Sequence, residues 1–270
     1  VDDLKTLYMV LDKHGTSVTE PGQYGGVGNL DLRKPHDVAK LHAFVKSREI
    51  GGMSPNERRV ELLLKDKKPG QLPNIIFDIT GKSPSDITNK LPLLQKAGYE
   101  PQNIHICWIL TDFSVAISQN RKRPRVVPED IVLMTHQGTF ETAYQMIKGQ
   151  IPRGIDGSFV VVFGGSNKSV SYEIGKEPVL TKGFSKANVK FDPVKKNYYV
   201  EGNQKVIKDF SYIVLKEPGK PYDPVDVVKK KEQNTVDMPK LLQFVYDAVP
   251  KTTETADSLK DIENWKNSLK

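Results

Sequence analysis

Hydrophobic residues recur at helical spacing in the first 65 positions of the chain. Three segments show this pattern: residues 3–13, a segment that begins at Pro35, and one that begins at Pro55 and carries Val60 to Leu64. Proline is favoured in the first turn of a helix, where its missing N–H has no partner to lose. The pattern therefore predicts three amphipathic helices before residue 65.

Short apolar runs alternate with helical segments in the next part of the chain. The runs are 74–78, which ends in Asp78, and 103–110. Helices are expected over 85–97, from Phe113, and from Pro128 to Lys148. Near-continuous apolar strands that alternate with helices are typical of a parallel sheet flanked by helices. We therefore predict an α/β fold in which strands 74–78 and 103–110 are parallel neighbours.

The pattern changes after about residue 156. A strand is expected over 158–163, and shorter alternating segments follow at 197–200 and 210–215. These suggest antiparallel pairing. Pro218 to Pro221 resembles a linker, and the rest of the chain has helical spacing. We expect an α/β core over 1–155, a β-rich region over 156–218 and a helical, basic extension over 219–270.

Composition narrows the class of protein. Of 270 residues, 37% are hydrophobic and 27% are charged, which excludes collagen-like and fully disordered chains. No apolar run approaches the roughly 20 residues of a membrane helix, and the N-terminus lacks the features of a signal peptide. We expect no membrane partner and a cytoplasmic location. The single cysteine, Cys107, lies in an apolar run and is interpreted as an inert core thiol in a reducing compartment.

The net charge of +7 is unevenly distributed. Four cations occur within residues 121–125, and their mutual repulsion would be relieved by a multiply charged anion. Guanidinium groups bind phosphate oxygens in a bidentate manner. Two other interpretations stay open: a surface for RNA or an acidic protein, and an ordinary basic helix end. Asp78 stands where open α/β sheets bind ligands and could hold hydrated Mg²⁺, or it could cap the following turn.

Several short motifs between residues 74 and 128 occur together. They are Asp78-Ile79-Thr80-Gly81, Gly98-Tyr99, the stretch from Gln119 to Arg125, and Val127-Pro128. In this order and spacing they resemble the zeta-toxin and polynucleotide-kinase-like branch of P-loop kinases, which includes kinase-like proteins of large bacteriophages. The first residues of the chain, Asp2 followed by a helix, resemble the acid at the end of the family's second strand.

The resemblance implies a P-loop kinase-like fold and a phosphotransferase activity. The γ-phosphate of ATP or GTP, with Mg²⁺, would move to a hydroxyl of a nucleotide, a nucleotide sugar or a polynucleotide end. It implies Asp2 as general base, Asp78 as the Mg²⁺-linked acid, Thr80 and Arg121 as nucleotide-binding residues, and Arg123 and Arg125 as cations on the γ-phosphate. For a phage protein the location would be the virion.

The chain departs from the family in one important respect. No Gly-x-x-x-x-Gly-Lys-Ser/Thr loop occurs in its 270 residues, and Gln119 replaces the first lid arginine. The family's loop lies just upstream of the acid that Asp2 resembles. Two hypotheses follow: a kinase whose loop precedes these residues, or a non-catalytic kinase-fold protein with a structural or assembly role. Without the loop we expect weak nucleotide binding or none.

Two glycine-rich segments are weaker candidates for phosphate binding. Residues 163–169 follow a strand but lack the glycine before Lys168, and the segment after them reads as strand. Residues 24–28 are interpreted as a flexible surface loop. The expected partners are a nucleotide or phosphorylated small molecule, with nucleic acid or protein partners in an assembly as alternatives.

Overall fold

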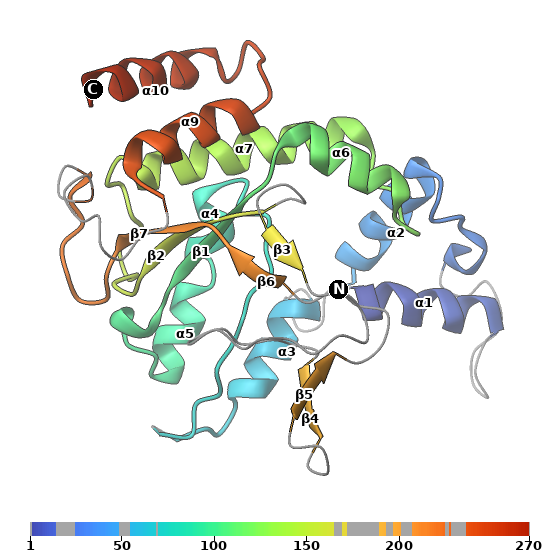
Figure 1. Ribbon diagram of the computed structural model, residues 1–270. Helices are drawn as coiled ribbons and strands as arrows, with labels where there is room; N and C mark the ends of the chain where they lie inside the picture. Colours follow the sequence, from blue (N-terminus) through green and yellow to red (C-terminus); the bar gives the residue numbers. More distant parts are fainter. Residues whose placement is uncertain are drawn as a thin grey trace. The chain divides into compact units, whose positions relative to one another are not determined.

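The computed structural model describes residues 2–14, 25–48, 55–68, 70–164, 169–171, 189–192, 197–200, 207–224, 227 and 236–269 (Figure 1). The chain forms two compact units. The first unit comprises Val1–Glu100 and Phe113–Thr142, and the second comprises Pro101–Asp112 and Ala143–Lys270. Each unit is therefore built from two separate stretches of sequence.

The first unit is helical in its described part. Its helices are α1 (Asp2–His14), α2 (Pro35–Lys46), α3 (Pro55–Leu64), α4 (Pro84–Thr88), α5 (Leu91–Ala97), α6 (Phe113–Lys122) and the larger part of α7 (Glu129–Ile147). The three predicted N-terminal helices are confirmed. The helix expected over 85–97 is two helices instead, because Pro92, in the first turn of α5, has no backbone N–H to donate to a carbonyl of the preceding turn. Gly98, at φ 100°, ends α5 as expected.

A small apolar cluster joins α1, α2 and a 3-10 turn at Val27–Asn29. Val27, Leu41 and Val45 are buried at its centre. Gly28 is buried here as well, where a Cβ atom would lie 2.6 Å from the backbone nitrogen of Lys13. The described end of the glycine-rich segment thus packs on α1, which corrects its interpretation as a surface loop. Residues 15–24 lie outside the described ranges.

The predicted strand at 74–78 is wrong. The segment has no regular secondary structure and pairs with no strand in the described ranges, and Ile76 is 94% exposed. An apolar run indicates a strand only when a neighbouring strand accepts its backbone hydrogen bonds, and that partner cannot be identified from the run alone. The neighbour of β1 (Ile106–Leu110) is β2 (Phe159–Phe163).

The sheet of the second unit has the order β1-β2-β7, where β7 is Tyr212–Lys216. β1 and β2 are parallel, in register from Ile106 opposite Phe159 to Leu110 opposite Phe163. β7 is antiparallel to β2. The sheet is therefore mixed rather than parallel. The predicted α/β class holds in this coarser form: a three-stranded open sheet flanked by helices, including α9 (Met238–Ala248), against which α10 (Ala256–Ser268) packs in turn.

Two further strand pairs confirm the antiparallel character expected after residue 156. β3 (Ser169–Ser171) pairs with β6 (Ile207–Phe210), and β4 (Val189–Asp192) pairs with β5 (Asn197–Val200). The predicted domain boundaries at 155 and 218 stay predictions.

The core of the second unit lies between the sheet and its helices. Phe159, Val161 and Phe163 alternate inward along β2, and Phe163 meets Phe244 of α9 edge-on at 4.8 Å. Along β1 the alternation turns Cys107 and Ile109 outward, with Ile109 64% exposed. The interpretation of Cys107 as a core thiol is therefore wrong. No helix in the described ranges is long and apolar enough to span a membrane.

Candidate anion-binding site

The turn that follows Asp78 is fixed on helix α7. The Thr139 hydroxyl donates a hydrogen bond to the Thr80 carbonyl at 2.7 Å. One residue earlier on α7, a Cβ atom at Gly138 would lie 2.4 Å from the carbonyl oxygen of Lys82. Only glycine allows the turn to approach the helix this closely. The contacts hold the backbone of residues 80–82, while the residues Asp78 and Thr80 are exposed.

The basic loop, residues 121–125, comprises the last two residues of α6 and the turn that follows them, and it is closed by a buried amide. Asn120, in the last turn of α6, donates from Nδ2 to the Val127 carbonyl at 2.7 Å. Its Oδ1 accepts the Val127 N–H at 2.9 Å. Asn120 is only 4% exposed, so both polar atoms of its side chain are used inside the protein. This pair of bonds fixes the path of the chain between α6 and α7.

A second anchor comes from the segment that precedes α2. The Leu32 carbonyl accepts the Val126 N–H at 2.9 Å. The Arg33 guanidinium donates to the carbonyl of Arg123 at 2.6 Å, and to that of Arg121 at 3.4 Å. The basic loop is thus held from two sides, although it carries four cations.

Arg121 uses its side chain within the protein. Its Nε and Nη2 donate to the two carboxylate oxygens of Glu129 at 2.6 and 3.1 Å. The hydrogen bond to Arg121 lowers the pKa of Glu129. Both side chains are exposed, so the pair adds little to stability. In this conformation, however, the charge of Arg121 faces Glu129.

Four cations from four separate segments influence one histidine. The pKa of His42, on α2, lies below its ordinary value because of partial burial first, and then because of nearby positive charges. The charges are those of Lys5 on α1, Lys46 on α2, Arg125 in the basic loop and Lys82 in the turn after Asp78. We call these four residues the cationic cluster. A positive field of this kind favours a bound anion.

Lys5 is the most enclosed member of the cationic cluster, at 7% exposure. Placing an ammonium group in such a position is costly unless its surroundings compensate the charge. The cluster lies wholly in the first unit.

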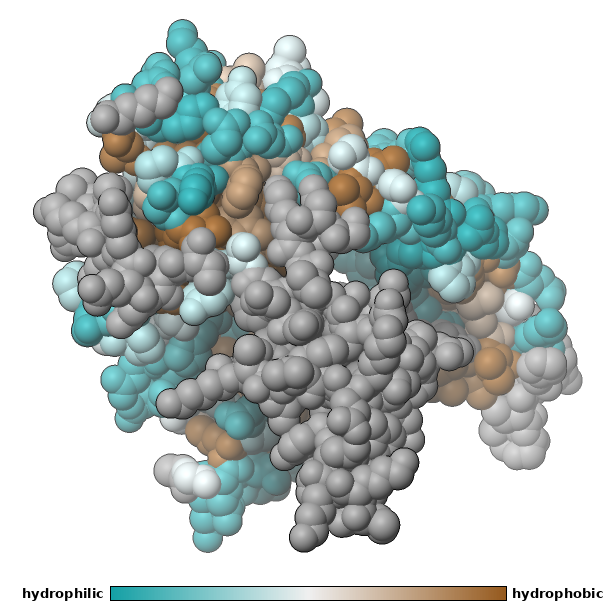
Figure 2. Space-filling model, viewed as in Figure 1, coloured by the Kyte–Doolittle hydropathy of each residue, from teal (hydrophilic) through white to brown (hydrophobic). Residues whose placement is uncertain are grey.

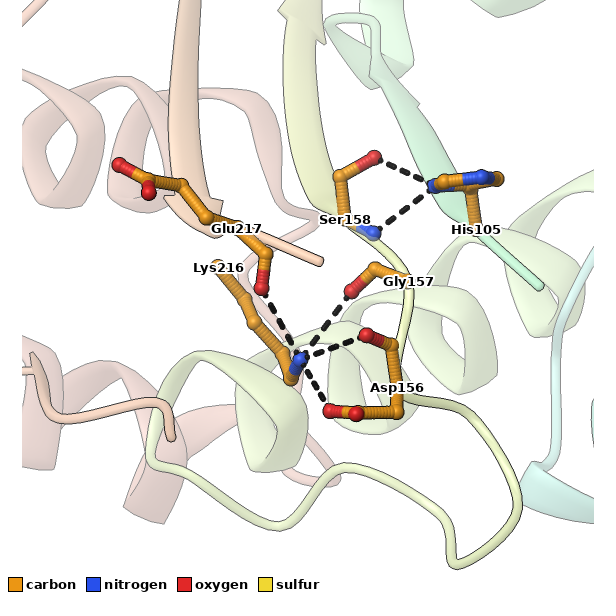
Figure 3. A network of polar contacts seen from close by, with 6 residues as sticks. All are labelled: His105, Asp156, Gly157, Ser158, Lys216 and Glu217. Atoms are coloured by element: carbon orange, nitrogen blue, oxygen red, sulfur yellow. Dashed lines mark hydrogen bonds and ion pairs between the residues drawn. The ribbon is translucent and has the colours of Figure 1, made fainter. Parts of the chain in front are cut away.

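The second unit contains a buried cation of a different kind (Figure 3). Lys216 is 6% exposed, and its Nζ lies 2.7 Å from Asp156 Oδ1. The same nitrogen donates to the carbonyls of Asp156, Gly157 and Glu217 at 3.0, 3.3 and 3.1 Å. Protein groups thus account for all the hydrogen-bonding capacity of this ammonium, so we assign it a structural role.

His105 and Ser158 lie beside this network (Figure 3). His105 Nδ1 accepts the Ser158 N–H at 2.9 Å and lies 2.9 Å from the Ser158 hydroxyl oxygen. Because the backbone N–H occupies the nitrogen's lone pair, the ring is poorly placed to act as a base toward the serine. The contact instead joins the beginnings of β1 and β2.

Of the predicted site residues, Arg125 is the one whose charge acts on His42. Lys82, which was not predicted but directly follows the Asp78-Ile79-Thr80-Gly81 motif, acts on the same histidine. Asp2 begins α1, one turn before Lys5, and its side chain lies outside the described part. Arg123 is exposed in the basic loop. The roles of Asp2, Asp78, Thr80, Arg121, Arg123 and Arg125 stay predictions.

The weaker glycine-rich candidate has a packing role in its described part. Gly164 follows β2, and its N–H donates to the Leu110 carbonyl at 2.8 Å. A Cβ atom at Gly164 would lie 2.6 Å from Thr111 Oγ1. Ser169–Ser171 forms a strand, as expected, where a phosphate loop would lead into a helix. Residues 165–168 lie outside the described ranges.

Sequence reasoning missed Lys5, Arg33, Lys46 and Lys82. Lys82 could have been found, because it directly follows the Thr80-Gly81 motif. Lys5 and Lys46 occupy amphipathic helices, where lysine is ordinary. Arg33 gives no signal in the sequence, because its role depends on carbonyls about 90 residues away.

Within the described ranges, no group of three or more His, Cys, Asp or Glu side chains is placed to hold a metal ion. Comparisons of the chain with protein-family models, with curated proteins and with solved structures found no match.

Proposed function

We propose that the chain is the phosphate-handling part of a zeta-toxin-like phosphotransferase. The observation that carries this proposal is the cationic cluster around His42. It draws on α1, α2, the turn after Asp78 and the basic loop, and three of these four segments carry the motifs of the resemblance.

The chemistry of these residues suits a polyphosphate. Arginine and lysine side chains that converge on one anion stabilise the charge that spreads over phosphoryl oxygens during transfer. Mg²⁺ is commonly held by one or two carboxylates together with the phosphates, so the exposed carboxylate of Asp78 could serve it. Bound Mg²⁺ would neutralise phosphate charge. Asp2 would accept the acceptor's hydroxyl proton, and Arg123 and Arg125 would bind the γ-phosphate.

Titration calorimetry with inorganic tripolyphosphate tests the anion site in this chain. We expect weak binding, of the order of 1 mM, that weakens further as salt is added. Replacing both Arg123 and Arg125 with alanine should weaken binding at least tenfold, since each charged hydrogen bond contributes about 1.5–3 kcal/mol. Arg58→Ala, which removes an arginine paired with Glu61 on α3, is the matched control. Equal binding by the double variant and the control would contradict the proposal.

Catalysis requires a separate test. We expect transfer of a labelled γ-phosphate only from a protein that joins these residues to a phosphate loop, because that loop supplies several backbone N–H groups to the phosphates. In such a protein, Asp2→Asn should abolish transfer while tripolyphosphate still binds. Transfer at the wild-type rate by Asp2→Asn would exclude Asp2 as the base.

A second candidate function is a non-catalytic role in an assembly, such as a bacteriophage particle. It is favoured by large hydrophobic side chains that reach the surface, visible as brown areas between teal ones in Figure 2. In the first unit these exposed residues are Leu7, Val10, Leu62, Leu63, Ile76, Ile79, Ile131 and Met134. Where such residues form a contiguous patch, the patch commonly marks a protein interaction site. Sedimentation that shows concentration-dependent self-association, without any tripolyphosphate binding, would favour this alternative.

A further inference from the structure

The basic loop is tied to a distant arginine through its backbone. We propose that Arg33 is a positioning residue that holds residues 121–123 in a preset conformation for anion binding. This inference rests on the proposed function: Arg33 would order the anion site before the ligand binds.

The contacts of Arg33 carry the argument. Its Nη1 and Nη2 donate to the carbonyls of Arg123 and Arg121, at 2.6 and 3.4 Å. These acceptors are two residues apart, so one planar guanidinium spans the turn between them. Because these two nitrogens donate to backbone oxygens, Arg33 acts here on the shape of the loop rather than on a ligand.

Arg33 is itself held in place. Its N–H donates to Asp31 Oδ1 at 2.9 Å, and the Asp31 N–H donates to Asp37 Oδ2 at 2.9 Å. Asp37 belongs to the first turn of α2, the helix that carries His42 and Lys46. The guanidinium is therefore connected, through short local bonds, to the element that supplies part of the cationic cluster.

Electrostatics explains why such a device is useful. Arg121, Lys122, Arg123 and Arg125 repel one another, so without an anchor Arg123 and Arg125 would move away from the two cations that end α6. The anchors at Arg33 and Asn120 hold the backbone against that repulsion before any anion arrives. A site ordered in advance loses less conformational freedom on binding.

Limited trypsin digestion measures the order of the loop without any ligand. Trypsin can cut after Arg121 and Lys122, whereas the bond after Arg123 precedes a proline and resists. We expect Arg33→Gln to raise the rate of cleavage at the two sites about tenfold. This corresponds to a decrease of about 1.4 kcal/mol in the free energy of opening the loop. Arg58→Gln, with the same loss of charge on α3, should leave the rate unchanged. Circular dichroism should show unaltered thermal unfolding for both variants.

Arg33→Lys separates positioning from charge. Lysine keeps the positive charge but presents a single nitrogen, which cannot span the two carbonyls as the guanidinium does. A positioning role predicts intermediate cleavage, about threefold above wild type, with a parallel weakening of tripolyphosphate binding. Arg33→Gln should weaken binding about tenfold.

The outcomes divide clearly. Cleavage of Arg33→Gln within twofold of wild type overturns the inference, as does an Arg33→Lys variant that matches wild type in both cleavage and binding. Faster cleavage with unchanged tripolyphosphate binding also overturns it, because loop order would then not serve the anion. If wild type binds no tripolyphosphate, the proposed function fails, whereas the cleavage ratio still decides whether Arg33 presets the loop.

Discussion

The two units use their lysines and arginines differently. In the second unit, Lys216 meets Asp156 and three carbonyls, and Lys148 pairs with Asp261 at 2.7 Å. In the first unit, the positive charges of four cations help to lower the pKa of His42, after partial burial. Both units use cations to join their own elements, as Arg121 does with Glu129 in the first unit, but only the first unit also has several cations that act together on one histidine.

The two units also differ in how completely they bury their hydrophobic side chains. Phe159, Val161 and Phe163 of the second unit are 0–1% exposed, in contact with a well-packed helix. Of the nine large hydrophobic residues that the described ranges expose most, only Ile109 belongs to the second unit. This comparison indicates that the second unit is the better packed of the two. Under our proposal the first unit carries the ligand chemistry, in keeping with binding sites that commonly occupy the less stable part of a protein.

The largest effect is expected in the core of the second unit. Phe163→Ala should destabilise it by about 3–5 kcal/mol, because a fully buried ring and its contact with Phe244 are lost. Both tryptophans, Trp108 and Trp265, belong to this unit, so their fluorescence reports its unfolding in urea. Ile76→Ala in the first unit should change stability by less than about 0.5 kcal/mol. Comparable losses in the two variants would break the comparison.

Removing the buried ammonium should have the next largest effect. Lys216→Met leaves the carbonyls of Asp156, Gly157 and Glu217 without their donor, and we expect a loss of about 2–3 kcal/mol in the same fluorescence assay. Lys220→Met removes an exposed lysine that pairs with Glu217, and should cost less than about 1 kcal/mol. A neutral Lys216→Met would show that the network of Figure 3 is not structural.

Gly138→Ala tests how tightly the first unit holds the turn after Asp78. Alanine normally stabilises a helix by up to about 1 kcal/mol relative to glycine. Here its Cβ would lie 2.4 Å from the Lys82 carbonyl oxygen. We therefore expect the free energy of unfolding to fall by about 1–2 kcal/mol, measured by circular dichroism. Ser118→Ala, on the exposed side of α6, should be neutral or slightly stabilising. A stabilised Gly138→Ala protein would show that the turn is free of α7.

The smallest expected effects are changes in the stability of the two units at low pH. The pKa values of His42 and His136 are lowered in the folded first unit, so the unfolded chain binds protons more readily. Stability should therefore fall as pH drops below about 6.5. In the second unit, hydrogen bonds from Lys148 and Tyr144 lower the pKa of Asp261, so its contribution persists to below about pH 4 and is lost in stronger acid.

Circular dichroism, which sees both units, should therefore detect weakening near pH 6 before tryptophan fluorescence does. The double variant with glutamine at 42 and 136 should remove the early change. If both signals were lost at the same pH in the wild-type protein, the two units would not differ in their sensitivity to acid.

The sequence predicted the parts of the fold that depend on local pattern. Helices α1, α2, α3, α6 and α7 follow from local pattern, and α2, α3 and α7 also carry a proline or acids in the first turn. The failures depend on partners distant in sequence. Run 74–78 looked like a strand, yet the parallel neighbour of β1 is β2, about 50 residues further along the chain. Cys107 was placed in a core because a continuous apolar run does not reveal which face of an edge strand is covered.

The candidate site was predictable in outline only. The basic loop is visible as a run of charges, and the Thr80-Gly81 motif marks the turn beside Lys82. Lys5, His42 and Lys46 join them only through the packing of α1 and α2 around Val27 and Leu41. Tertiary contacts of this kind leave no signature in one sequence.

The most direct test of the anion site is the pKa of His42 with and without tripolyphosphate, measured by NMR on histidine-labelled protein and assigned with His42→Gln. We expect the His42 pKa to lie below about 6.5 in the free protein and to rise on binding, because the anion offsets the charges of the cationic cluster. His136 is the internal control, since burial alone lowers its pKa. A His42 pKa that stays constant at saturating tripolyphosphate, or that shifts only in step with His136, would contradict the account.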